Sequence, residues 1–162
     1  MIKRFNPDNQ KLHPYLLHFI SNLRDSDFYL TDSNNRVYIE DFVSLKKLLK
    51  NSSYHFVLEE NGDYSAFCLL WKSNGGDKIR YYLKIVAKDT KSANNLLRGF
   101  FWNINNIEIF AKINKRHKFL DVFKKYGFKF LGGRGRQILL KRDKFLRPEL
   151  PIYNKDAENE EK

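Results

Sequence analysis

The chain has 162 residues, of which 42% are hydrophobic and 15% aromatic. This length fits a single domain with a substantial core, and the composition is globular and excludes a disordered chain. The net charge is +11 at pH 7, from 30 Lys and Arg against 19 Asp and Glu. Such a surface attracts anions, including nucleic acid, phosphorylated cofactors and acidic proteins. A basic surface with no dedicated anionic partner is the equally weighted alternative.

The cysteine and hydropathy patterns exclude several further classes of protein. A single cysteine, Cys68, lies in an apolar run, so an internal disulfide is impossible and a buried thiol is expected. No Cys and His residues have the spacing of a zinc site, and we expect no metal. No apolar stretch approaches about 20 residues, and no signal-peptide core follows the N-terminus. We therefore expect an intracellular location, either the cytoplasm or the interior of a virion, and no membrane contact.

The first third of the chain is predicted to be mainly helical. Residues 2–5 fit a short edge strand, and Asn6, Pro7 and Asp8 are typical of a helix start. Apolar residues then recur at helical spacing and predict one buried stripe, made of Leu12, Tyr15, Leu16, Phe19, Ile20 and Leu23. Residues 25–35 are rich in Asp, Ser and Asn and predict a loop. A second helix is predicted over residues 43–49.

The pattern then alternates and predicts strands over residues 54–59, 64–71 and 79–87, the first two forming a hairpin. Helical spacing returns at residue 89 and places five apolar residues inward: Ala93, Leu96, Leu97, Phe100 and Phe101. A strand over residues 107–113 and a helix over 116–126 follow. Gly127 is expected to end that helix. Two strands, 128–131 and 137–141, close a domain that spans residues 1–145.

The last segment, residues 146–162, differs in composition from the rest of the chain. It contains Pro148 and Pro151, followed by four acidic residues: Asp156, Glu158, Glu160 and Glu161. Segments with so little apolar surface have little to bury. We expect a flexible, acidic C-terminal tail that is mobile or docks on the basic body or on a partner.

The order of elements and one C-terminal motif carry a resemblance to a known family. Residues 107–114 lead through Phe119 and Val122 to the pair Gly127-Phe128, which resembles the strand, helix and Gly-Phe turn of the GCN5-related N-acetyltransferase (GNAT) superfamily. The similarity covers residues 54–142 and, more loosely, the first two helices, and the chain resembles a divergent member of the kind found in phages. It implies an α/β fold with a mixed, mostly antiparallel central sheet flanked by about four helices.

The resemblance also implies acetyl-CoA as cofactor. In the family, a glycine-rich turn and the N-terminus of the next helix hold the coenzyme pyrophosphate. The corresponding turn here spans residues 88–93, and Lys91 stands where the family has its first glycine. The implied cofactor-binding residues are Lys88, Thr90, Lys91, Ser92, Ala93 and Asn114. The alternative interpretation of the turn is that Asp89 or Thr90 simply caps the helix.

The catalytic residues implied by the resemblance are Tyr126 and Glu59. The family's tyrosine acid aligns with Phe123, which has no proton to donate, so Tyr126 is the nearest alternative acid. Packing of Tyr126 beside Gly127 is the competing interpretation. A general base is expected near the central strands, where Glu59 is the nearest candidate, together with Glu60. A solvated strand end is the alternative for both carboxylates.

Two functions follow from the sequence. The first is an N-acyltransferase that transfers an acetyl group from acetyl-CoA to an amine of a protein, a small molecule or a nucleobase, as in phage Mom-type DNA modifiers. The second is a catalytically degenerate GNAT-fold protein, structural or associated with nucleic acid, similar to phage internal head proteins. The basic C-terminal third favours nucleic-acid contact, with Arg134 and Arg136 in a glycine-rich turn as candidate phosphate ligands. The sequence predicts no particular oligomeric state.

Overall fold

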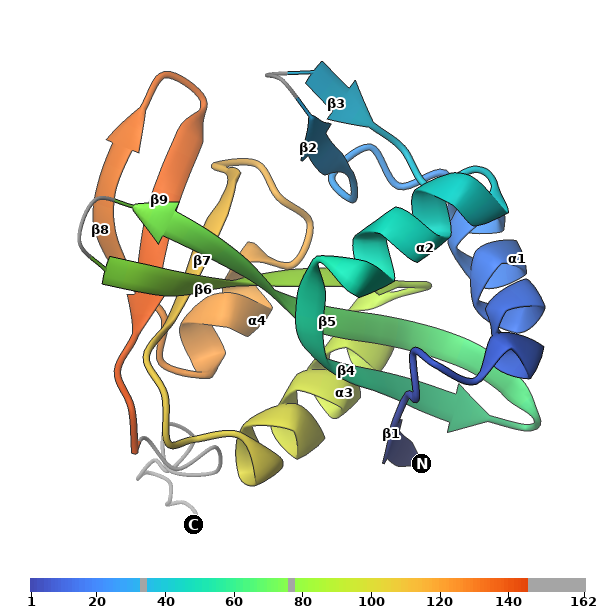
Figure 1. Cartoon of the computed structure of the whole chain (residues 1–162). Coiled ribbons are helices and arrows are strands. Elements are labelled where there is room, and N and C mark those ends of the chain that lie inside the picture. The colour runs from blue at the N-terminus through green and yellow to red at the C-terminus, as the bar shows by residue number, and fades with distance from the viewer. Residues whose placement is uncertain (33–34, 76–77, 146–162) are drawn as a thin grey trace, which may run out of the picture.

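The computed structural model describes residues 1–32, 35–75 and 78–145 (Figure 1). Its helices are η1 (Gln10–Leu12), α1 (His13–Leu23), α2 (Phe42–Lys50), α3 (Thr90–Asn103) and α4 (Leu120–Lys125). Its strands are β1 (Ile2–Arg4), β2 (Leu30–Asp32), β3 (Asn35–Val37), β4 (Ser52–Glu60), β5 (Asp63–Gly75), β6 (Lys78–Ala87), β7 (Ile109–Asn114), β8 (Lys129–Arg134) and β9 (Gln137–Arg142). The acidic tail predicted over residues 146–162 lies outside the described residues.

Seven strands form one sheet in the order β1-β4-β5-β6-β7-β9-β8. All neighbouring pairs are antiparallel except β6 and β7, which are parallel. The β6–α3–β7 segment is the crossover that a parallel pair requires. This architecture, with four α-helices in the described part of the chain, confirms the predicted α/β fold with a mostly antiparallel sheet.

The two faces of the sheet build two separate cores. Along β5, Ala66, Cys68 and Leu70 pack in the cluster under α3 and α4, whereas Phe67 and Leu69 pack in the cluster under α1 and α2. This division follows from the alternation of side chains along a strand. Cys68 is fully buried, as predicted. In the described residues, no helix is long and apolar enough to cross a membrane.

The helix predicted directly after residues 6–8 begins later than expected. The Asn9 side chain accepts a hydrogen bond from the Lys11 N–H and caps the short η1, so that α1 starts only at His13. The imidazole of His13 bonds to the Pro7 carbonyl through Nε2 at 2.7 Å, which fixes the preceding turn. Within α1, Leu16 and Ile20 are buried as predicted, but Tyr15 is 68% exposed and does not belong to the buried stripe.

Two other segments differ from their sequence predictions. The predicted loop at residues 25–35 contains β2, which pairs with β3 in a separate two-stranded sheet. The helix predicted over residues 116–126 is confined to α4, because two side chains accept backbone hydrogen bonds before it starts: Asn114 Oδ1 from Arg116 N–H and His117 Nδ1 from Phe119 N–H. Such local bonds compete with helix formation. Gly127, at φ +93°, ends α4 as predicted.

The parallel contact between β6 and β7 is short. It joins Tyr81 to Ile109 and Tyr82 to Phe110, after which β6 continues to Ala87 beside β5 only. The Lys88 N–H donates to the Ser65 carbonyl of the strand β5. Because N–H groups alternate in direction along a strand, those of Ile85 and Ala87 point to the opposite side, where the described part of β7 offers no strand partner. The two strands therefore open toward the N-terminus of α3.

The aromatic packing under α3 predicts a large stability difference between two adjacent residues. Phe101 is fully buried against Phe100, Tyr126 and Phe128, whereas Trp102 on the same helix is 66% exposed. We expect Phe101→Ala to lower the free energy of unfolding by about 3–5 kcal/mol because it leaves a core cavity. The matched control, Trp102→Ala, should change it by about 0.5 kcal/mol or less. Guanidinium denaturation followed by circular dichroism measures both, and equal losses would contradict the described packing.

Candidate functional site

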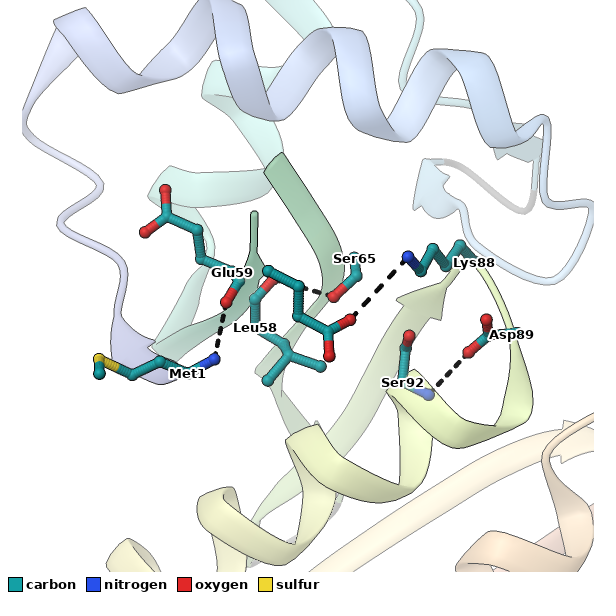
Figure 2. A network of polar contacts seen from close by, with 8 residues as sticks. Met1, Leu58, Glu59, Ser65, Lys88, Asp89 and Ser92 are labelled. Atoms are coloured by element: carbon teal, nitrogen blue, oxygen red, sulfur yellow. Dashed lines mark hydrogen bonds and ion pairs between the residues drawn. The ribbon is translucent and has the colours of Figure 1, made fainter. Parts of the chain in front are cut away.

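The N-terminus of α3 lies where β6 ends, and its first turn is capped by the chain itself. Asp89 has an extended backbone, and its carboxylate accepts a hydrogen bond from the Ser92 N–H at 2.8 Å (Figure 2). This backbone bond, with a second contribution from the Ser92 hydroxyl, lowers the pKa of Asp89 below its ordinary value. The predicted alternative of a simple helix cap is therefore present in the structure, and an anionic carboxylate occupies one N–H group of the helix terminus.

The residues implied for cofactor binding divide into two kinds. Lys88, Thr90 and Lys91 are exposed, and the Lys88 ammonium lies 3.9 Å from the Glu60 carboxylate. Ser92 and Ala93 are buried, so a ligand would reach them mainly through their backbone. The structure thus brings five of the six implied residues together on one turn, with two lysines facing solvent beside a helix N-terminus.

Asn114, the sixth implied residue, lies at the end of β7. Its side chain accepts the Arg116 N–H at 2.8 Å, and its backbone pairs with Gln137 of β9. The observed contacts of Asn114 therefore shape the turn between β7 and α4. A direct role in cofactor binding stays a prediction.

Tyr126 is almost fully buried at the end of α4, and both its side-chain hydroxyl and its backbone carbonyl form hydrogen bonds. Its hydroxyl donates to Asn94 near the start of α3, 2.9 Å from Oδ1, and its carbonyl accepts the Arg142 Nε–H at 2.7 Å. Burial raises the pKa of the Tyr126 hydroxyl. Phe123, at the position that the resemblance assigns to the family's acid, is buried edge-on against Phe128. Tyr126 therefore fastens α4 to the start of α3, whatever further role it has.

Glu59 lies at the end of β4, next to the N-terminus of the chain. Its carboxylate is 2.6 Å from the Lys3 ammonium, and its carbonyl accepts the amino group of Met1 (Figure 2). Glu59 and Lys88 line a common cavity of about 810 Å³ beside α1, which has apolar walls that include Phe19 and Tyr64. The predicted base and one predicted cofactor residue thus meet in one cavity. Tyr126, in the cluster under α3 and α4, is not part of its lining.

Arg134 and Arg136 lie at the tip of the β8–β9 hairpin. Both are exposed, and Gly135 between them adopts the left-handed conformation at φ +64°, which suits glycine. The Arg136 carbonyl accepts the Lys115 N–H at 2.8 Å and fixes the base of the turn. The guanidinium groups are available to an anionic partner, and nucleic-acid contact stays a prediction.

One residue in the middle of the sheet was missed by sequence reasoning. Lys84 is partly buried on β6, and its ammonium donates to the Tyr29 carbonyl at 2.9 Å. Burial lowers the pKa of Lys84 to about 8. A lysine between apolar residues of a central strand was the available signal, because alternation places its side chain on one covered face of the sheet. Across the described ranges, no three His, Cys, Asp or Glu side chains group as metal ligands would.

The fold of this chain is similar to that of solved acetyltransferase structures. The ribosomal-protein-alanine N-acetyltransferase of Brucella melitensis matches with a TM-score of 0.65 and 12% identity, over 88% of this chain and 99% of that one. A GNAT-family acetyltransferase of Streptococcus pneumoniae matches with a TM-score of 0.63 and 12% identity, over 88% and 97%. A putative acetyltransferase of Salmonella typhimurium, solved with its cofactor acetyl-CoA, matches with a TM-score of 0.60 and 10% identity, over 95% and 98%.

Sequence comparison is less informative than the structure. No family model matches the chain, and no curated protein matches it in sequence. At identities of 10–12%, structural similarity establishes the fold and leaves substrates and residue roles open. The chain therefore has the fold of the GNAT acetyltransferases.

Proposed function

We propose that the protein is an N-acyltransferase that binds acetyl-CoA at the opening between β6 and β7 and acetylates an amine. The observation that carries this proposal is the short contact between the two strands, which ends at Tyr82 and Phe110. Beyond it, the N–H groups of Ile85 and Ala87 face the opening, and α3 begins directly after β6. Backbone donors of this kind suit the amide groups of the coenzyme arm, and a helix N-terminus suits its phosphates.

The charges around the first turn of α3 fit a phosphorylated ligand, with one opposing group. Lys88 and Lys91 are exposed beside the turn and would hold the coenzyme phosphates. The Asp89 carboxylate opposes them, since it already accepts the Ser92 N–H. Phosphate binding at that N–H therefore requires the Asp89 side chain to turn away, which costs part of the affinity.

The cofactor would supply the acetyl thioester, and the chain would bind the two substrates and move the proton. An ammonium acceptor must lose a proton before it can attack a carbonyl. Glu59 is our candidate base because it lines the same cavity as Lys88. To act as a base, its carboxylate must break the ion pair with Lys3 and bind the amine of the acceptor. Tyr126 is our candidate acid, and its hydroxyl would have to leave Asn94 to act.

The cofactor site is tested by isothermal titration with acetyl-CoA at low and moderate salt. We expect saturable, micromolar binding that persists at moderate salt. Asp89→Asn should bind about two- to five-fold more tightly, because it retains the cap but removes a charge with an effect of about 0.3–1 kcal/mol at a helix terminus. Lys91→Ala should bind more weakly. Lys46→Ala, an exposed lysine on α2, serves as the control for net charge.

Two results would contradict the proposal of acetyl transfer. One is absence of binding by the folded wild-type protein. The other is weakening in Lys46→Ala equal to that in Lys91→Ala, which would indicate general attraction to a basic protein. Binding without acetyl transfer to any amine in a panel of peptides, amino sugars and DNA would favour the degenerate, non-catalytic alternative.

The role of Tyr126 is tested by Tyr126→Phe. We expect this variant to lose about 1 kcal/mol of stability, because the partly buried Asn94 oxygens lose the Tyr126 hydroxyl as a donor, although Oδ1 keeps the Lys125 ammonium. Tyr15→Phe, which alters an exposed hydroxyl on α1, should leave stability unchanged. Thermal denaturation and the rate of acetyl-CoA consumption are measured on the same samples. Unchanged stability with a large loss of maximal rate would assign Tyr126 to acid catalysis and contradict its anchoring role.

A further inference from the structure

A second cavity lies on the opposite side of the sheet from α3 and α4. Along β6, Leu83 and Ile85 pack under α3 and α4, and Val86 packs under α1 and α2, so alternation places Tyr82 and Lys84 on the α1 and α2 side. The β2–β3 hairpin stands apart from the large sheet (Figure 1) and, with β5, β6, β7 and β9, encloses a cavity of about 380 Å³. We call this cavity the hairpin pocket. Its volume is within the range of small-molecule sites.

The charged residues of the hairpin pocket are all cations. Arg36 comes from the hairpin, Lys84 from β6 and Lys112 from β7, and the described lining contains no carboxylate. None of the three forms an ion pair within 4.0 Å with a described side chain. A hydrogen bond with the Tyr38 side chain raises the pKa of Arg36, with smaller contributions from Tyr29 and from the Asp27 carboxylate. Three cations from three elements therefore line the pocket, and no carboxylate of the described lining stands beside them.

Lys84 is the central cation of the hairpin pocket. Its ammonium donates to the Tyr29 carbonyl and lies over the rings of Tyr29 at 5.1 Å and Trp71 at 5.9 Å. Neither a carbonyl nor a ring neutralises the charge, and a partly buried charge without a counter-ion is unfavourable. The same desolvation lowers the pKa of Lys84. An anionic group beside Lys84 would remove this cost.

The remaining walls of the hairpin pocket are aromatic. Tyr29, Trp71 and Tyr82 all contribute to the lining and are partly buried. The Arg36 guanidinium already stacks on Tyr29, 4.6 Å from the ring centroid. Aromatic rings offer flat apolar faces, and arginine pairs with carboxylate and phosphate through two parallel hydrogen bonds. The lining thus combines a recognition site for an acidic group with one for a planar ring.

We propose that the hairpin pocket binds a small organic anion in which a carboxylate or phosphate is attached to a planar ring. The acidic group lies against Lys84 and Arg36, and the ring lies against Trp71 and Tyr82. This site shares no residue with the turn at residues 88–93, so it does not require acetyl-CoA. With the proposed acyl transfer, a ligand of this class that also carries an amine would be the acceptor.

The proposal is tested by nuclear magnetic resonance titration of the full chain without acetyl-CoA, following the indole N–H of Trp71. The ligands are phenyl phosphate, phenylacetate and the neutral analogue phenylacetamide. Both anions are expected to shift the Trp71 signal with saturation, and at least one should bind about ten-fold more tightly than phenylacetamide, the size of a charge-assisted hydrogen bond. The tighter of the two anions identifies the acidic group.

Matched variants make the test specific to the pocket. Lys84→Met should weaken anion binding by about ten-fold or more, whereas Lys78→Met, an exposed lysine on the same strand, should change it by less than about two-fold. Arg36→Gln, at an exposed position, should also weaken binding and supplies the test if Lys84→Met does not fold. Equal binding of phenylacetamide, or equal weakening by Lys78→Met, would overturn the proposal. A Trp71 response to a short single-stranded oligonucleotide, with none to the small anions, would overturn it in favour of nucleic acid.

Discussion

The contact between β6 and β7 extends over only two residue pairs, and the candidate cofactor site depends on where it ends. Each strand has a long antiparallel partner on its other side, β5 for β6 and β9 for β7. Both strands are therefore held in the sheet without further pairing to each other. The helix α3 connects them, and its N-terminus directly follows the end of β6 that is paired with β5 but not with β7. Because β6 and β7 pair over so short a length, the N–H groups of Ile85 and Ala87 and the N-terminus of α3 lie at the same opening.

The chain has a net charge of +11, and the two candidate ligand sites differ in whether a carboxylate stands beside their basic residues. At the start of α3, Lys88 and Lys91 are opposed by Asp89, whose carboxylate already uses a helix N–H. In the hairpin pocket, Lys84 and its two neighbouring cations have no carboxylate in the described lining. An anion displaces an existing interaction at the first site and supplies a missing one at the second. An anion would therefore gain more electrostatic stabilisation in the hairpin pocket than at the start of α3. The similarity in fold, by contrast, favours the opening between β6 and β7 as the cofactor site.

Long periodic segments made much of the fold predictable from the sequence. The apolar spacing of α3 and the alternation of β4, β5 and β6 are strong local signals, and the five residues predicted to face inward from α3 are all buried. The β2–β3 hairpin was missed because residues 25–35 are polar and short strands have no clear period. The predicted helix before Gly127 was too long, because residues 114–119 form local turns in which the Asn114 and His117 side chains accept backbone N–H groups.

The candidate sites were less predictable because they depend on contacts distant in sequence. The Tyr126 hydroxyl meets Asn94, 32 residues away, and the Lys84 ammonium meets the carbonyl of Tyr29, 55 residues away. The resemblance identified the turn at residues 88–93 from its place between a strand and a helix. The alternative that Asp89 or Thr90 caps the helix was also open from the sequence, and the structure assigns the cap to Asp89, whose carboxylate accepts the Ser92 N–H. The hairpin pocket had no sequence signal beyond a lysine within an apolar strand.

Amide hydrogen exchange along β6, with and without acetyl-CoA, tests most directly whether a cofactor site lies between β6 and β7. Lys84 and Val86 direct their N–H groups toward β5, whereas Ile85 and Ala87 direct theirs into the opening. We expect the Ile85 and Ala87 amides to exchange faster than those of Lys84 and Val86 in the free protein, and to become protected when acetyl-CoA is added. Equal protection of all four amides in the free protein, unchanged by acetyl-CoA, would contradict a cofactor site between β6 and β7.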